Sequence, residues 1–266
     1  MATDPAPIYE VLRDTLRTDA PVALATVTEG PHLGAKLLVR PDVPVVGTLG
    51  DPDLDRVVAR DALGELESGL TSTRHYGVHG EAREREVAVF IESFAPAPRM
   101  VIFGAVDFTA ALAKAGKLLG YRVTVCDARP VFATRQRFPM ADEVVNDWPD
   151  RHLAKIADTL GPRDAVCVLT HDAKFDVPAI VGALATRVGY LGAMGSRKTH
   201  TRRVERLREA GVDDAGLARV MAPIGLDIGA RTPEETAIAI CAEVIALRTG
   251  RDTAPSLRDG AGPIHT

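Results

Sequence analysis

Two short polar segments, each preceded by an apolar run, carry the side chains best suited to chemistry. The first is Thr170-His171-Asp172-Ala173-Lys174, whose hydroxyl, imidazole and carboxylate groups could hydrogen-bond a ligand, and His171 could transfer a proton. The alternative is a simple turn in which Thr170 or Asp172 caps the helix that follows. The second segment is Gly192-Ala193-Met194-Gly195-Ser196-Arg197-Lys198-Thr199, whose small residues allow close backbone approach.

The second segment predicts an anion site because of where its cations fall. Ser196 is a good N-cap residue, which places Arg197 and Lys198 in the first turn of a helix. Cations in that turn oppose the helix dipole, whereas a bound phosphate would attract them together with the free backbone N–H groups. The alternative is a solvated basic helix, because the segment continues with Arg202, Arg203, Arg206 and Arg208.

A third candidate is the turn at Gly104, where a dinucleotide-binding fold would place its glycine fingerprint. Asp127 follows about 20 residues later, at the position that would hold ribose hydroxyls. However, Val106 replaces the glycine that lets the backbone touch a pyrophosphate, and Asp107 would repel a diphosphate. We therefore do not expect conventional NAD(P) binding. A structural turn capped by Asp107 and a modified site for another ligand remain open.

Motifs for metal or nucleophilic chemistry are absent from the sequence, which has no HExxH pair, P-loop or CxxC pair. His75 and His79 are four residues apart in a segment that reads as a strand, which would put them on one face without a third ligand. We expect neither a metal site nor catalytic residues. The three cysteines, Cys126, Cys167 and Cys241, read as buried small hydrophobic residues.

Strands and helices alternate in the C-terminal half, which places these segments at strand ends. This order predicts an α/β fold, a Rossmann-like parallel sheet with helices on both faces. Ligands in such sheets bind beyond the carboxyl ends of the strands. The expected strands are 100–103, 122–126, 143–146, 165–169 and 188–191. The expected helices are 107–119, 152–160, 177–186 and 196–210, followed by a last helix that Thr232 caps.

The N-terminal half reads as a smaller α+β domain. Its helices are expected at 8–17 and from Pro52 to just before Gly69, with β-rich segments between and after them. The proline-rich segment 94–99 marks a boundary. We expect an N-terminal domain over 1–95, a Rossmann-like domain over 99–250 and a flexible tail over 251–266, because the tail is polar and rich in glycine and proline.

The net charge and the length of the apolar runs indicate which classes of partner to expect. The formal net charge of −4 over 266 residues gives no reason to expect nucleic acid. No apolar run approaches the roughly 18 residues that a membrane-spanning helix needs, so we expect no membrane partner and a cytoplasmic protein.

Three runs resemble the XdhC/CoxI family, accessory proteins of molybdenum hydroxylases. They are Val168 to Asp172, Gly189 to Lys198 and Ala222 to Glu235. The resemblance implies a homodimeric protein that binds the molybdopterin-type molybdenum cofactor, protects it and delivers it to a xanthine dehydrogenase-type hydroxylase. Such a protein is not the hydroxylase, although the family often carries that enzyme's name. The implied partners are a sulfurtransferase and a molybdenum hydroxylase subunit.

The sequence departs from the family pattern at two places. Gly104-Ala105-Val106-Asp107 stands where the family has Gly-Ala-Gly-His, and Gly47 to Pro52 lacks the cysteine that many members carry. Three hypotheses stay open: a cofactor chaperone, an NAD(P)- or nucleotide-dependent oxidoreductase, and a degenerate member that acts as an interaction module. The cofactor-binding residues expected for the first are Gly104, Asp127, Thr170, His171, Asp172, Gly195, Ser196, Arg197 and Lys198.

Overall fold

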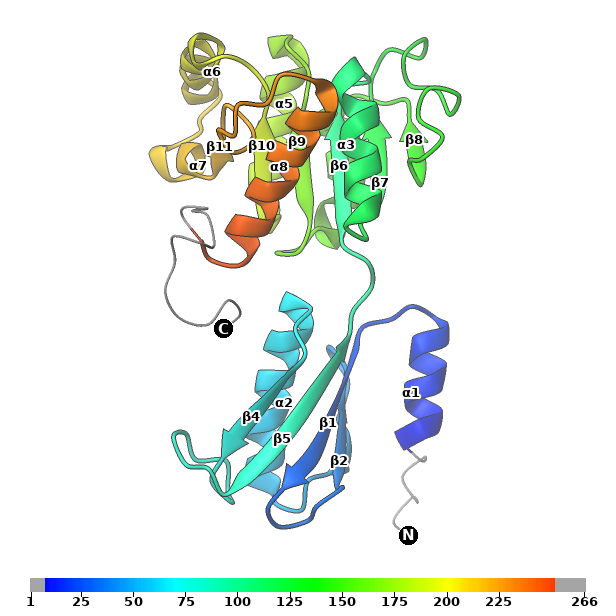
Figure 1. Ribbon diagram of the computed structural model, residues 1–266, viewed down its shortest axis with the longest axis vertical. Coiled ribbons are helices and arrows are strands. Elements are labelled where there is room, and N and C mark those ends of the chain that lie inside the picture. The colour runs from blue at the N-terminus through cyan, green and yellow to red at the C-terminus, as the bar shows by residue number, and fades with distance from the viewer. Residues whose placement is uncertain (1–7, 252–266) are drawn as a thin grey trace. The chain divides into compact units, whose positions relative to one another are not determined.

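The computed structural model describes residues 8–251 of the chain, so the expected tail beyond Arg251 lies outside the described residues. The chain divides into two compact units, Met1–Pro96 and Ala97–Thr266, hereafter unit 1 and unit 2 (Figure 1). Each unit has its own apolar core. None of the helices in residues 8–251 is long and apolar enough to cross a membrane.

Unit 1 is an antiparallel five-stranded sheet with one helix on each face. The strand order is β3-β2-β1-β5-β4. Alternating side chains of β1 and β2 face opposite ways, so Ala23 and Leu37 pack with α2 while Leu24 and Leu38 pack with α1. The elements are α1 (Ile8–Arg17), β1 (Val22–Glu29), β2 (Lys36–Val39), β3 (Val46–Thr48), α2 (Pro52–Ser68), β4 (Ser72–Tyr76) and β5 (Val87–Phe94).

Unit 2 is a parallel six-stranded sheet in the order β11-β10-β9-β6-β7-β8. The strands are β6 (Arg99–Phe103), β7 (Arg122–Cys126), β8 (Glu143–Val145), β9 (Ala165–Val168), β10 (Tyr190–Ala193) and β11 (Val220–Met221). The helices are α3 (Asp107–Leu118), α4 (Pro149–Ile156), α5 (Ala173–Leu184), α6 (Arg197–Glu209), α7 (Asp214–Ala218) and α8 (Pro233–Arg248), with a short 3₁₀ helix at Ala157–Thr159. The predicted α/β class is confirmed.

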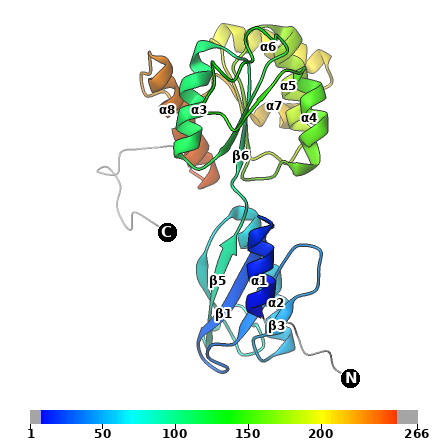
Figure 2. The same cartoon turned by 90° about the vertical axis from the view of Figure 1, so that its right-hand side faces the viewer.

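Helices cover both faces of this sheet, as Figure 2 shows. Leu112 of α3 and Ile240 of α8 belong to the core on one face. Leu153 of α4, Ile180 of α5 and Leu207 of α6 belong to the core on the other face. Strands buried on both sides need apolar residues throughout, which explains why all four residues of β9 and of β10 are buried.

The first strand of unit 2 lies inside its sheet. From β6 the chain builds β7 and β8 on one side and then crosses back to β9, β10 and β11 on the other. The connections therefore diverge between β6 and β9, and sheets of this kind bind ligands at the crevice beyond such a point. Because all six strands are parallel, their carboxyl ends share one edge, and every candidate segment of unit 2 lies along it.

Several boundaries differ from the sequence-based expectation. Helix α5 begins at Ala173 rather than 177, because the carboxylate of Asp172 caps it by accepting the Lys174 N–H at 3.1 Å. Helix α4 begins three residues early, at Pro149, and β10 ends two residues late, at Ala193. The short elements α7 and β11 were not expected, since five and two residues are too few to show a hydrophobic period.

Candidate functional site

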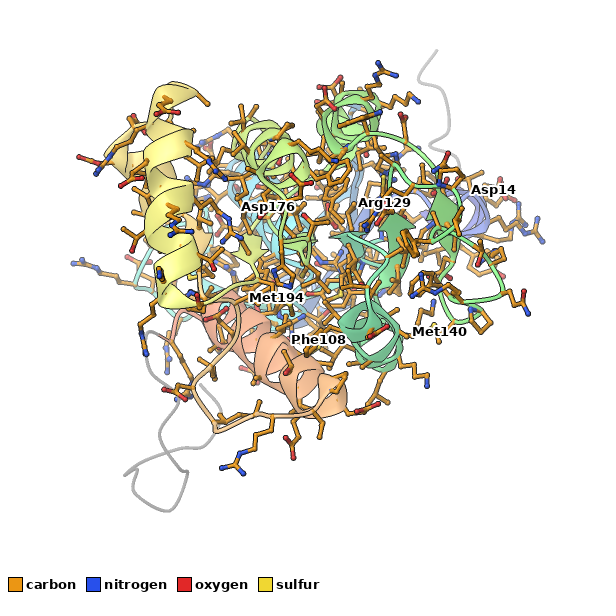
Figure 3. All side chains as sticks on the ribbon, turned by 90° about the horizontal axis from the view of Figure 1, so that it is seen from above. Asp14, Phe108, Arg129, Met140, Asp176 and Met194 are labelled. Atoms are coloured by element: carbon orange, nitrogen blue, oxygen red, sulfur yellow. The ribbon has the colours of Figure 1, made fainter. Side chains whose placement is uncertain are left out.

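Figure 3 looks onto the carboxyl edge of the unit 2 sheet. Phe108, Arg129, Asp176 and Met194, labelled there, come from four different connections between strands. Asp176 and Met194 lie towards α6, and Arg129 lies across the edge from them. Segments that are up to about 90 residues apart in sequence thus meet here, as parallel-sheet folds require.

The turn after β6 uses most of its own donors. The Ala105 N–H donates to the Asp127 carboxylate at 2.7 Å, and the Val106 N–H donates to the Thr109 hydroxyl at 3.3 Å. Val106 is the N-cap of α3, and Asp107 is the first helical residue with a side chain that is 93% exposed, so the expected Asp107 cap is wrong. The Ala105 and Val106 N–H groups at this turn are therefore satisfied by protein groups.

Gly104 keeps the same turn closed against its neighbour. Its φ is +108°, and a Cβ there would lie 2.6 Å from the Thr170 Cγ2 atom. Only glycine accommodates both the dihedral angle and the contact. The turn after β6 and the segment after β9 are thus packed against each other at Gly104.

Asp127 is buried and has its acceptor positions filled. One oxygen accepts the Arg129 N–H and Nε–H, both at 2.9 Å, and the other accepts the Ala105 N–H and the Arg129 Nη2–H, both at 2.7 Å. Burial acts to raise the pKa of Asp127, but these hydrogen bonds outweigh it and hold the pKa below its usual value. A carboxylate has about four lone-pair sites, so none remains for ribose hydroxyls in this arrangement.

The Arg129 guanidinium also contacts aromatic rings. It lies 4.6 Å from the ring centroid of Phe132 and 5.8 Å from that of Phe175. Trp148 lies against Phe175, with ring centroids 5.1 Å apart. Phe132 and Trp148 are about two-fifths exposed, at 41% and 40%. An aromatic surface, which the sequence reasoning missed, therefore flanks the Asp172 side of the edge.

A buried polar network joins the ends of β9 and β10. The Thr170 hydroxyl donates to one oxygen of Asp176, and the Arg203 Nη2 donates to the other at 2.8 Å. The same Nη2 donates to the Met194 carbonyl oxygen at 2.6 Å. Burial raises the pKa of Asp176, against the lowering by Thr170 and Arg203. Thr170, one of the expected site residues, thus uses its hydroxyl group to hold Asp176 rather than to bind a ligand.

The sequence analysis did not identify Asp176 and Arg203 as an ion pair, although the sequence contains one indication that Arg203 is buried. Thr199, Arg203 and Leu207 recur every four residues, and Leu207 is fully buried. An arginine in the buried stripe of a helix needs a buried carboxylate. The alternative of a solvated basic helix is wrong for Arg203, which is 3% exposed, whereas Arg202, Arg206 and Arg208 are exposed.

His171 and Asp172 face solvent beside this network. Both side chains are exposed, and Asp172 also forms an ion pair with Lys174 at 3.2 Å. The backbone N–H of Lys174 lowers the pKa of Asp172 below its usual value. These two residues, unlike Thr170, are accessible to a ligand at the edge of the sheet.

The segment after β10 is the most cationic part of the edge. Gly195 has a φ of +142°, and Ser196 caps α6 by accepting the Thr199 N–H at 3.1 Å. Arg197 and Lys198 occupy the first turn, which contains no acidic residue. Within residues 8–251 neither forms an ion pair with a carboxylate. The expected N-cap is confirmed, and it leaves two unpaired cations at a helix N-terminus.

Cysteine and histidine chemistry is not supported by the geometry. All three cysteines are buried, and burial raises the pKa of Cys126 to about 12 and that of Cys241 to about 11, so neither is a thiolate at neutral pH.

No group of three potential metal ligands occurs in the part of the chain that the structure describes. His79 lies beyond the end of β4 and contacts Asp51 at 2.8 Å, so the expected shared strand face with His75 is wrong.

Comparison with known proteins supports this architecture. A family model described as the XdhC Rossmann domain matches residues 100–244, and one described as the XdhC and CoxI family matches residues 15–77. A xanthine dehydrogenase structure from Bacillus halodurans is 22% identical, with a TM-score of 0.51, and the match covers 93% of this chain and 97% of that one. At that identity the likeness shows the fold alone.

Curated relatives match over parts of their length. YqeB of Escherichia coli is 27% identical over 86% of this chain and 44% of its own. A Bacillus subtilis protein named as a probable xanthine dehydrogenase subunit is 32% identical over 60% of this chain and 46% of its own. The molybdenum cofactor insertion chaperone PaoD of Escherichia coli is 28% identical over 60% of this chain and 43% of its own. The chain spans less than half the length of these relatives.

On the strength of the Rossmann-domain match, which covers more than half of its residues, this chain belongs to the XdhC and CoxI family.

Proposed function

We propose that this protein is an accessory protein that binds the molybdopterin-type molybdenum cofactor, protects it and inserts it into a xanthine dehydrogenase-type hydroxylase. The observation that carries the proposal is the pair of unpaired cations, Arg197 and Lys198, at the N-terminus of α6. They lie on the sheet edge where this fold binds ligands. The relatives named for cofactor insertion and for xanthine dehydrogenase agree with this role.

The residues at the edge fit a phosphate-bearing ligand. The free N–H groups of the first helical turn and the two cations suit the phosphate of the cofactor. His171 and Asp172 are the exposed polar groups next to it. Gly104, Asp127 and Thr170 hold the neighbouring turns in place rather than offering free groups. The bound cofactor would supply the molybdenum centre that the client enzyme uses.

A sulfur donor, in this proposal, is a separate protein. The chain's cysteines are buried and protonated at neutral pH, so they do not suit persulfide chemistry. The sulfurtransferase partner, the homodimer and the cytoplasmic location stay predictions.

The NAD(P)-dependent alternative is less well supported. At the turn after β6, the Ala105 and Val106 N–H groups are bonded internally and the Asp127 oxygens are filled. A pyrophosphate there would have to displace these bonds. A thermal-shift screen with NAD, NADP, FAD and CTP tests this alternative, since a ligand at 100 times its Kd stabilises a protein by about 2.7 kcal/mol.

Titration with isolated molybdenum cofactor tests the proposal directly. We expect the Arg197→Ala, Lys198→Ala double variant to bind the cofactor at least about tenfold more weakly, because each charge-assisted hydrogen bond is worth about 1.5–3 kcal/mol. The control is a Lys114→Ala, Arg208→Ala double variant, which removes the same charge at exposed positions elsewhere in unit 2. Equal affinities of the two double variants would contradict the site. Absence of cofactor binding combined with pull-down of a hydroxylase subunit would favour the interaction-module alternative.

A further inference from the structure

A second cationic feature of unit 2 lies between α5 and α6, on the side of α6 that carries Thr199, Arg203 and Arg206. It is a cavity of about 220 Å³. Sites for drug-sized ligands measure about 300–1,000 Å³, so this cavity suits a small ion or one group of a larger ligand. The residues that line it include His171, Asp176, Thr199, Arg202, Arg203 and Arg206.

Helical spacing brings three guanidinium groups to this cavity. Thr199, Arg202, Arg203 and Arg206 are separated by three, one and three residues, which places them on one side of α6. Arg202 and Arg206 are four residues apart, so their like charges repel each other. Within residues 8–251 neither forms an ion pair with a carboxylate. An anion between them would turn this repulsion into attraction.

Arg203 supplies the decisive observation. Its side chain is 3% exposed, and its Nη2 is used by Asp176 and Met194. Its Nε and Nη1 are buried and have no hydrogen-bond partner among the described residues. Buried polar groups are nearly always hydrogen-bonded, and an unpaired cationic donor is among the most unfavourable of them. Asp176 cannot accept these hydrogen bonds as well, because its oxygens already take Thr170 and the Arg203 Nη2.

The lining charges identify the chemistry of the missing partner. Three guanidinium groups face a single carboxylate, so the cavity carries an excess of positive charge. Guanidinium N–H groups suit oxygen acceptors of a phosphate in particular. We propose that the cavity between α5 and α6 binds a phosphate-type oxyanion, held by the Arg203 Nε and Nη1 together with Arg202 and Arg206. This site uses other cations than the Arg197–Lys198 turn, although His171 lies beside both, and it does not depend on the proposed function.

Calorimetric titration with inorganic phosphate, at constant ionic strength set by chloride, tests this site in the full chain. We expect Arg202→Gln and Arg206→Gln each to weaken phosphate binding by about tenfold. Arg208→Gln is the matched control, because Arg208 is on the same helix but pairs with Asp214 at 3.0 Å. The Arg208→Gln variant should bind phosphate with the same affinity as the unaltered protein. Arg203 itself is left in place, since its loss would strand the buried Asp176.

A second readout reports on the buried group. The ¹⁵N–¹H resonance of the Arg203 Nε–H should shift during the phosphate titration, and it should do so in the Arg197→Ala, Lys198→Ala variant too. A shift of the same resonance on addition of cytidine monophosphate would show that the site also accepts a phosphate ester. A shift with inorganic phosphate alone would assign the site to the free ion.

Three outcomes overturn the inference. The first is no phosphate-specific heat and no movement of the Arg203 resonance. The second is equal weakening by Arg208→Gln, which would indicate general charge screening. The third is loss of phosphate binding in the Arg197→Ala, Lys198→Ala variant with no effect of Arg202→Gln or Arg206→Gln, which would assign the phosphate to the helix N-terminus and leave the proposed function standing.

Discussion

Asp176 and Arg203 carry opposite charges into the interior of unit 2, where their side chains are 5% and 3% exposed. Desolvation of both ions is tolerable only because each finds further partners, Thr170 for the carboxylate and the Met194 carbonyl for the guanidinium. The pair therefore fixes the ends of β9 and β10 relative to α5 and α6. It also holds Arg203 in position at the proposed oxyanion cavity.

Removal of one member of this pair should be strongly destabilising. We expect Asp176→Ala to lower the free energy of unfolding by about 3–5 kcal/mol, because it leaves a buried guanidinium unpaired. The Asp176→Leu, Arg203→Met double variant should lose much less than the sum of the single changes. Urea unfolding of the wild type, Asp176→Leu, Arg203→Met and the double variant measures the coupling, and Asp176→Ala measured beside them gives the first number. Additive losses would show that the two side chains are not coupled.

Connections between strands and helices decide which groups the sheet edge offers. Capping residues are recognisable locally: Ser196 and Thr232 cap α6 and α8, as their positions in the sequence predict. The α8 cap is a full capping box, in which Glu235 accepts the Thr232 N–H at 3.0 Å. The turn after β6 is different, because its closure depends on a residue from another connection, Thr170.

Two glycine variants separate backbone strain from this packing. Gly104 and Gly120 both have positive φ, +108° and +81°, but a Cβ at Gly120 would meet no atom within 4 Å. Gly120→Ala should therefore show the backbone penalty alone. Gly104→Ala should lose about 1–3 kcal/mol more, because its methyl group would press on Thr170. Chemical denaturation of both variants is the measurement, and equal losses would mean that the turn is not packed against Thr170.

Over the whole molecule, each of the two units is stabilised by its own apolar clusters. The unit 1 core lies between its antiparallel sheet and α2, and the unit 2 cores lie on the two faces of the parallel sheet. The candidate cofactor residues and the oxyanion cavity both belong to unit 2. Neither site draws a residue from unit 1.

Each unit should fold without the other. We expect segments 1–96 and 97–266, produced separately, to show the circular dichroism of an α+β and an α/β protein and to unfold cooperatively. The 97–266 segment should give the same Arg203 Nε–H resonance position as the full chain. A segment that lacks a cooperative transition would show that its core needs the other unit.

Local patterns determined the classes of element and the fold of this protein. Apolar periods of about two and 3.6 residues, capping residues and the proline-rich segment 94–99 are all encoded within short windows, which is why strands, helices and the parallel sheet were predictable. Only the tertiary structure decided which polar groups are already used. Asp127 proved to be filled by Arg129 and Ala105, and Arg203 proved to be buried against Asp176, 27 residues earlier. The contacts of Asp127 with Ala105 and of Asp176 with Arg203 form only when segments distant in sequence lie side by side, and burial then strengthens the interaction between the charged groups.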